Sequence, residues 1–364
     1  MRHRGAGSRA RIGGGIVLVA CGCALALVSA LVFAPAASAH APLAAGSNES
    51  LATATHIPDP TKSWAIYADL HKGGEAQYYT FRATSGDSIP LSLFTSPAKA
   101  EDGFVPSLVI MGSGIPDRGT APGFVEKPPG AGVTVVPGSP AGHGSYEPFS
   151  PSAIRQMAAQ TLVAPQDGTY YLAVYGNDRG GRYSLAIGSR ESFTPAEWAT
   201  LPFVFPTIYQ WEGEPRWFVF APAAVVLVLG LGLLLRRGRR GSRLDLAGWT
   251  ASLAGLLFVA TGATVVVQMA FAQLQAEFDG AALVTLVLAA LPIGIGWLTL
   301  RTAQHNSGSW TAGSRAVLAL LGLAAVVVWA GWLAGPALAI VAALLPPWRR
   351  SATAVSSGRA SAPS

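Results

Sequence analysis

The sequence has little charge and almost no cysteine. Charged residues make up 12% of the 364 residues, against about a quarter in a typical soluble domain, while hydrophobic residues make up 51% and the mean hydropathy is +0.39. This composition excludes a disordered chain and a purely cytosolic enzyme. The two cysteines, Cys21 and Cys23, lie in one apolar run near the N-terminus. If that run is removed on export, neither a disulfide nor a cysteine metal site remains.

Motifs that carry enzyme chemistry are also missing. The chain contains no Gly-x-Ser-x-Gly nucleophile motif and no His-Glu-x-x-His zinc motif. Glycines such as Gly230 and Gly232 lie in an apolar run, where they do not cradle phosphate. The paired carboxylates Glu212 and Glu214 lie in a polar segment, and we expect solvent to cover them. We therefore expect a protein that is not an enzyme.

Basic residues are concentrated beside the apolar runs. Residues 40–217 hold 11 Lys and Arg against 16 Asp and Glu, whereas residues 218–364 hold 10 against 3. The pI near 9.5 therefore does not reflect a basic face with interleaved aromatics, which a nucleic-acid-binding domain needs. We expect membrane lipid, and not nucleic acid, beside the basic half of the chain.

The first 39 residues are typical of a secretory signal peptide. A start with four arginines precedes the apolar run Ile16 to Phe33 and the small-residue site Ala37-Ser38-Ala39. Cleavage after Ala39 makes His40 the mature N-terminus. Two alternatives stay open, namely a lipoprotein signal that ends at Cys21 and an anchor that is not cleaved.

Four apolar stretches in the second half each reach the ~20 residues that a membrane span requires. They predict an α-helical transmembrane bundle of four spans over 217–345, followed by a polar tail at 346–364. The first loop carries five arginines, the second is acidic, and the third carries Arg301 and Arg315. Because basic loops stay in the cytoplasm, the preceding domain is predicted to lie outside a plasma membrane. The stretches are 217–235, 246–271, 280–300 and 316–345.

The last apolar stretch is long for one helix and short for two. Gly335-Pro336 interrupts it, and we favour one tilted or kinked span over a hairpin of two helices of about 15 residues. The four stretches contain almost no ionisable side chains, which favours an anchor over a proton or ion pathway.

Residues 40–190 alternate short apolar runs with turn residues. This spacing predicts an exported all-β sandwich, jelly-roll-like, with the Gly- and Pro-rich segment 112–152 as a loop insert. The segment 191–216 is crowded with Trp, Tyr and Phe and is predicted to be a linker along the membrane interface. The runs that we expect to form strands are 63–68, 77–81, 91–94, 108–110, 169–175 and 183–187.

Several motifs of this domain resemble a known family. The runs Ala76-Gln77-Tyr78-Tyr79-Thr80-Phe81, Ser85-Gly86-Asp87 and Asp167-Gly168-Thr169-Tyr170-Tyr171-Leu172 are similar to those of the bacterial pre-peptidase C-terminal domain, over roughly residues 46–188. The resemblance implies a small β-sandwich that accompanies other domains of secreted and surface proteins. Here it implies such a sandwich fused to a membrane bundle. Where that family usually has Asp-x-Asp before its aromatic strand pair, this chain has Glu75-Ala76-Gln77.

Histidine offers one candidate ligand site. As a mature N-terminus, His40 presents its α-amine and a ring nitrogen to one metal ion, and a nitrogen of His56 or His143 would complete a copper site. Glu147 would then stand behind the ligands, whereas His71 is expected to be solvated. This pattern predicts an alternative function, an envelope copper-handling protein.

The favoured function is binding without catalysis. Tyrosines such as Tyr78 and Tyr170 either stack on sugars or fill the core, and strand alternation favours the core. We expect a membrane-tethered β-sandwich module that binds a protein or glycan partner at the cell surface and needs no cofactor.

Overall fold

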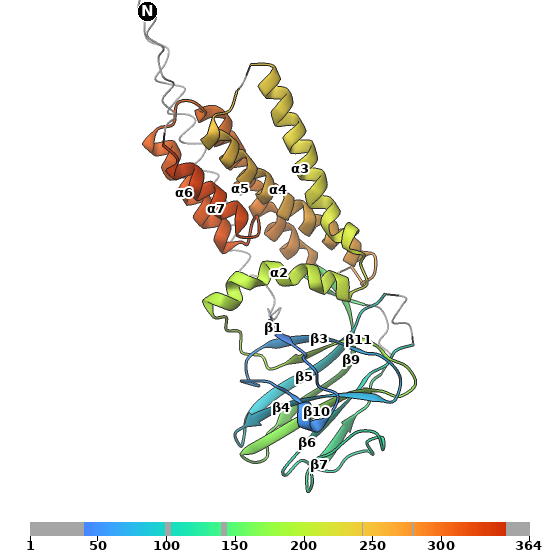
Figure 1. The fold of residues 1–364 in the computed structure, drawn as a ribbon. Helices are drawn as coiled ribbons and strands as arrows, with labels where there is room; N and C mark the ends of the chain where they lie inside the picture. The colour runs from blue at the N-terminus through green and yellow to red at the C-terminus, as the bar shows by residue number, and fades with distance from the viewer. Residues whose placement is uncertain (1–39, 99–102, 140–143, 242, 279, 347–364) are drawn as a thin grey trace, which may run out of the picture.

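The computed structural model describes residues 40–98, 103–139, 144–241, 243–278 and 280–346. A two-sheet β-domain forms the first part of the described chain, and six helices follow it (Figure 1). The predicted signal peptide at 1–39 and almost all of the tail at 346–364 lie outside the described residues.

The β-domain consists of two facing sheets. The first has the order β1-β3-β11-β5-β9-β8, and the second has the order β2-β4-β10-β6-β7. Neighbouring strands are antiparallel, except that β1 runs parallel to β3 and β2 runs parallel to β4. The strands of the first sheet are β1 (Ala41–Ala44), β3 (Trp64–Leu70), β5 (Ser88–Thr95), β8 (Ser145–Glu147), β9 (Ser152–Val163) and β11 (Gly181–Ile187). Those of the second are β2 (Thr55–His56), β4 (Glu75–Ala83), β6 (Ser107–Gly112), β7 (Gly132–Val136) and β10 (Gly168–Gly176), and a short 3-10 helix, η1 (Leu51–Thr53), precedes β2.

The core lies between the two sheets and follows the period-two pattern of the strands. Alternate residues of β10, Tyr170, Leu172 and Val174, are fully buried in it. The hydroxyls of Tyr79 and Tyr183 lie 2.6 Å apart, and Tyr183 also donates to Gln77 Oε1 at 2.5 Å. The buried tyrosines are therefore hydrogen-bonded core residues, which is the arrangement that buried phenols require.

The predicted strand runs are confirmed, whereas the segment 112–152 is more than a loop. It contributes β7 to one sheet and β8 to the other. The part around Val125 also covers the outer face of the second sheet, where the hydroxyl of Tyr78 accepts the Glu126 amide at 2.7 Å. Strand β9 continues this segment and was not expected from the sequence, because its polar and small residues hide the apolar alternation.

Three of the helices are long and apolar enough to cross a membrane, namely α3, α4 and α5. Helices α4 and α5 pack closely through glycine: a Cβ at Gly255 would lie 2.9 Å from Gly296 O, and one at Gly296 would lie 2.7 Å from Gly255 O. The helices are α2 (Pro195–Trp211), α3 (Arg216–Arg239), α4 (Leu246–Gln273), α5 (Ala282–Asn306), α6 (Ala312–Val327) and α7 (Ala334–Leu344).

The prediction of one kinked span over 316–345 is wrong. This stretch forms two shorter helices, α6 and α7, that fold back on each other. At one end of the hairpin, Arg315 donates to the carbonyls of Ala343 and Leu345. At the other end the chain reverses through a turn in which Trp329 and Trp332 have left-handed φ angles of 51° and 49°. Within the described residues, three helices meet the length of a span, and not the four predicted.

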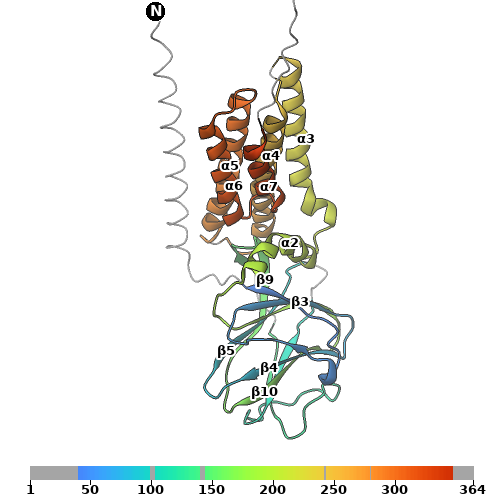
Figure 2. The same ribbon diagram turned by 60° about the vertical axis from the view of Figure 1, so that its left-hand side comes forward.

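The β-domain contacts the helices at several places. Helix α2 lies across the end of the bundle, between it and the first sheet (Figure 2). The hairpin of β8 and β9 reaches the ends of α4 and α5, where Tyr146 packs with Ala272 and Ala282. Its hydroxyl lies 2.7 Å from Thr285 Oγ1, which also donates to Pro148 O at 2.8 Å.

The start of helix α7 yields a stability prediction. A Cβ at Gly335 would lie 2.6 Å from Cε1 of Phe258, a fully buried side chain of α4. We expect Gly335→Leu to destabilise the bundle by about 2 kcal/mol or more, because the packed ring has no room to move. Gly232→Leu is the matched control, because nothing lies within 4 Å of a Cβ at that position in α3. Thermal unfolding in detergent measures both, and equal melting temperatures for the two variants would contradict the packing shown here.

Candidate ligand pocket between the β-domain and helix α2

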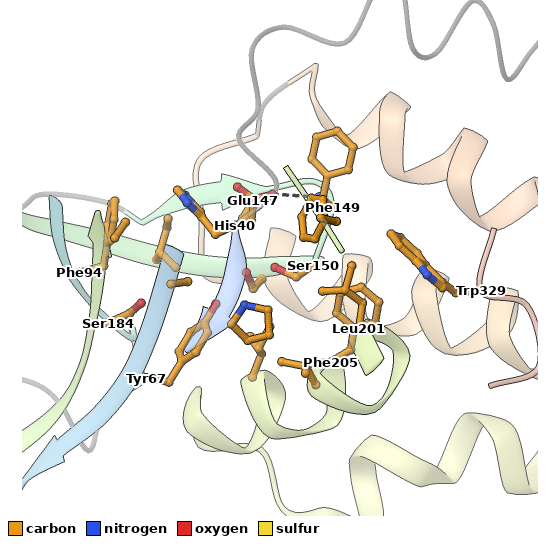
Figure 3. A pocket seen from close by; sticks show the side chains of 18 residues that line it. His40, Tyr67, Phe94, Glu147, Phe149, Ser150, Ser184, Leu201, Phe205 and Trp329 are labelled. Atoms are coloured by element: carbon orange, nitrogen blue, oxygen red, sulfur yellow. Dashed lines mark hydrogen bonds between the residues drawn. The ribbon is translucent and has the colours of Figure 1, made fainter. Parts of the chain in front are cut away.

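A pocket of about 320 Å³ lies between the outer face of the first sheet and helix α2. Its floor consists of small residues on neighbouring strands, Ala65 on β3 with Ser184 and Ala186 on β11. Larger side chains of the same face, Tyr67 and Phe94, stand at its margin (Figure 3). The hollow exists because the central strand alternates large residues toward the core with small residues toward α2.

Helix α2 is held over the pocket by contacts at both of its ends. At its start, Thr194 and Glu197 form a reciprocal capping box, and Lys62 Nζ lies 2.7 Å from Glu197 Oε1. At its end, the indole of Trp211 donates to Tyr183 O at 3.1 Å and packs edge-on against Tyr67 at 5.2 Å. The helix that closes the pocket is therefore anchored on the sheet itself.

The polar part of the pocket is formed by His40 and Glu147, which both line it (Figure 3). Ser63 Oγ lies 2.6 Å from His40 Nδ1, and burial lowers the pKa of this histidine. Glu147 Oε1 accepts the Phe149 amide at 3.0 Å. Burial raises the pKa of Glu147 to about 7, so this carboxyl changes charge near neutral pH.

The bundle contributes to the opposite, apolar part. Trp329 lines the pocket from the turn between α6 and α7, and Phe205 lines it from α2 (Figure 3). The ring of Trp329 packs on Trp198 with 4.2 Å between centroids, and its indole donates to Trp198 O at 3.0 Å. The pocket is thus assembled from the β-domain, α2 and the bundle, and each of the three supplies part of its wall.

The structure does not bring His40 and His56 together. His40 precedes β1 of the first sheet, whereas His56 ends β2 of the second and is exposed. Thr55, the residue before His56, donates a hydrogen bond to Ala45 O. His56 therefore lies near Ala45, and the five residues of largely extended chain between His40 and Ala45 span roughly 15 Å. His143 lies outside the described residues. In the described part of the chain no group of three or more His, Cys, Asp or Glu side chains is placed to hold a metal ion, and the copper site stays a prediction.

Three acidic residues that the sequence analysis singled out lie in or near this region. Glu147, which was expected to stand behind the ligands of a copper site, lines the same pocket as His40. Glu212 and Glu214 were expected to be solvated, and this is wrong: both are buried where α2 meets α3. The spacing of the two residues in the sequence does not reveal that the turn between α2 and α3 packs against β9. Trp329 and the small residues Ser184 and Ala186 were not singled out, although small residues on an outward strand face are a signal that another element covers that face.

The comparisons with known proteins are sparse. No family model and no curated protein matches the chain. Among solved structures, the chain is similar to the pre-peptidase C-terminal domain of a collagenase from Bacillus anthracis, with 21% identity and a TM-score of 0.24. The match covers 37% of this chain and 93% of that one. This is a weak likeness to a domain of the family that the sequence motifs resemble, and membership of that family stays a prediction.

The pocket carboxyl yields a prediction about pH dependence. The pKa of Glu147 rises from its ordinary 4.5 to about 7 in the folded state. Between pH 4.5 and pH 7 the folded protein therefore keeps the proton on Glu147, whereas the unfolded chain loses it. The stability from this proton is complete below pH 4.5 and is lost as the pH rises through 7. We expect Glu147→Gln to be about 2 kcal/mol more stable than the parent at pH 8 and nearly equal at pH 4.5.

Unfolding in detergent at the two pH values measures this difference. Glu49→Gln is the matched control, because Glu49 is exposed, and we expect it to match the parent at both values. A Glu147→Gln variant that matches the parent at pH 8 would show that this carboxyl is solvated.

Proposed function

We propose that this chain is a multi-pass plasma-membrane protein whose β-domain lies outside the cytoplasm and serves as a non-enzymatic binding module. The distribution of charge supports the orientation. Arginines gather at the end of the bundle that is far from the β-domain, where Arg237 donates to Gln304 Oε1 at 2.6 Å and Arg315 closes the α6–α7 hairpin. At the other end of the same helices, the loop from α4 to α5 meets the β-domain and carries Glu277. Basic loops stay in the cytoplasm.

The pocket under α2 is the observation that carries the binding function. It is concave, lined largely by apolar side chains and supplied with a few polar groups, which is the usual make-up of a ligand site. At about 320 Å³ it admits one bulky apolar group and not a whole macromolecule. Because Trp329 lines the pocket, a bound group would contact the membrane bundle as well as the β-domain.

A protein partner fits this surface better than a glycan. Sugar binding by stacking needs exposed aromatic faces, but Tyr78, Tyr79, Tyr170 and Tyr183 are all buried. The pocket instead offers Phe149 and Phe205 around a floor of small residues. The module would therefore capture an apolar side chain presented by a partner protein, and Glu147 and His40 would contact the polar backbone beside that side chain.

Reporter fusions test the orientation. An alkaline phosphatase fused after Gly188, at the end of β11, should be active, because this enzyme folds only outside the cytoplasm. The same reporter fused after Arg243, in the arginine-rich loop between α3 and α4, should be silent. The reverse pattern of activities would place the β-domain in the cytoplasm.

Photo-crosslinking in intact cells tests the pocket. A benzophenone amino acid in place of Phe149 should link to another polypeptide, whereas the same group in place of Phe124, on the far face of the second sheet beside Tyr175, should not. Filling the floor with Ala186→Phe should remove the crosslinked species while the melting temperature stays near that of the parent. Equal crosslinking at both positions, or crosslinking that survives Ala186→Phe, would show that the pocket is not the binding site.

A further inference from the structure

The last turns of α3 and α5 hold two arginines in one region, at the end of the bundle that is far from the β-domain (Figure 1). Arg237 on α3 donates to Gln304 Oε1 on α5 at 2.6 Å. Arg301 precedes Gln304 by three residues on the same helix, so these two side chains are neighbours on one face of α5. Because the side chain of Gln304 is neutral, it places both guanidinium groups in this region without cancelling either charge.

Carboxylates of the described chain do not balance these two charges. Neither arginine forms an ion pair with a described residue. After position 217 the sequence has three acidic residues, and two of them, Glu277 and Asp279, belong to the connection from α4 to α5. The third, Asp245, accepts hydrogen bonds from the Gly248 amide at 2.7 Å and from the indole of Trp310 at 2.9 Å. It is therefore used to hold the neighbouring loops together.

Arg301 also lies over an exposed aromatic ring. Its guanidinium carbon is 5.2 Å from the ring centroid of Trp297, one turn earlier on α5, and 49% of this tryptophan is exposed. The attraction between a cation and the face of a ring does not use the N–H groups of the guanidinium, so these groups can donate to two oxygens of one phosphate. Tryptophan side chains gather at the level of the lipid headgroups. The pair therefore stands where a phosphate of the bilayer would lie.

An exposed apolar stripe leads along α5 to these arginines. Leu286, Ile293 and Trp297 are all exposed, and their spacing of seven and four residues puts them on one face of the helix. Arg301 is the next residue of that face. Helix α5 is one of the three that are long and apolar enough to cross a membrane, so this stripe, which we call the α5 stripe, would face acyl chains. A free phosphate ion would contact the arginines alone, whereas a phospholipid would contact the arginines and the stripe together.

We propose that Arg237, Arg301 and Trp297 form a binding site for an anionic phospholipid of the adjacent membrane leaflet. The phosphate would accept hydrogen bonds from both arginines, and one acyl chain would lie along the α5 stripe. A headgroup without an ammonium group fits best, because the second arginine would repel a choline. The bound lipid would link the end of α3 to α5, in addition to the contact through Gln304. This inference depends neither on the pocket under α2 nor on the side of the membrane that the β-domain occupies.

Lipid titration of the full chain in a neutral detergent tests the proposal. Dioleoyl phosphatidylglycerol should raise the melting temperature by about 5 °C at saturation, and native mass spectrometry should detect the lipid bound to the chain. Dioleoyl phosphatidylcholine, which has the same acyl chains, should give a smaller rise and little retained lipid. Inorganic phosphate at the same concentration should leave the melting temperature unchanged, because it does not contact the α5 stripe.

Three variants complete the experiment. Arg237→Gln and Arg301→Gln should each lower the affinity for phosphatidylglycerol about fivefold. Both should fold, because both arginines are exposed, and Arg301→Gln also keeps the contact between Arg237 and Gln304. Arg239→Gln is the matched control: Arg239 is an exposed residue in the same turn of α3, and two residues from Arg237 it projects from a different face. This variant removes the same charge and should bind the lipid within twofold of the parent.

Three results would overturn the proposal. Equal losses of affinity in all three variants would show that the arginines attract anionic lipid only through their summed charge. Equal stabilisation by phosphatidylcholine would show that the acyl chains bind without help from the arginines. Stabilisation by inorganic phosphate that matches that of the lipid would show a site for a free anion. None of these results would affect the crosslinking at Phe149, so this site and the pocket are tested separately.

Discussion

The indole of Trp211, held between Tyr183 O and the ring of Tyr67, is the contact on which the arrangement of this protein depends. It ties the end of α2 to two neighbouring strands of the first sheet, β3 and β11. Because α2 has two internal prolines, Pro202 and Pro206, its own hydrogen bonds do not make it rigid. The sheet therefore determines where α2 ends, and that end determines where the first long apolar helix begins.

Two consequences follow from the position of α2. Its apolar face covers the small residues of β11 and leaves a hollow between Tyr67 and Phe205, which becomes the pocket. Its C-terminal turn, pressed between β9 and α4, carries Glu212 and Glu214 out of solvent. The same packing thus creates an apolar cavity on one side and a buried acidic cluster on the other, and both adjoin the interface between the β-domain and the bundle.

The bundle is joined to the β-domain by polar contacts as well as apolar ones. Tyr146 on β8 reaches Thr285 on α5, and the Glu277 amide donates to Gly144 O at 2.9 Å. Hydrogen bonds of this kind have narrow geometric limits, so they specify one orientation where apolar packing alone would allow several. A change in the ionisation of Glu147 or Glu214, whose pKa values both lie at about 7, would therefore act directly on the contacts between the two parts.

The sequence by itself determined the elements with strong local signals. The strands around Tyr79, Tyr170 and Tyr183 follow from alternation and turn residues, and the three long apolar helices follow from length and hydropathy. Local signals did not distinguish a kinked helix from a hairpin at 316–345, because the choice depends on Phe258, which packs against Gly331 and Gly335 from another helix. Nor did they show that Glu212 and Glu214 are buried, or that Glu147 faces Trp329 across a pocket, since these residues meet only when β9, α2 and the bundle are packed together. Periodicity records which face of an element is apolar, whereas the partner of that face is decided by tertiary packing.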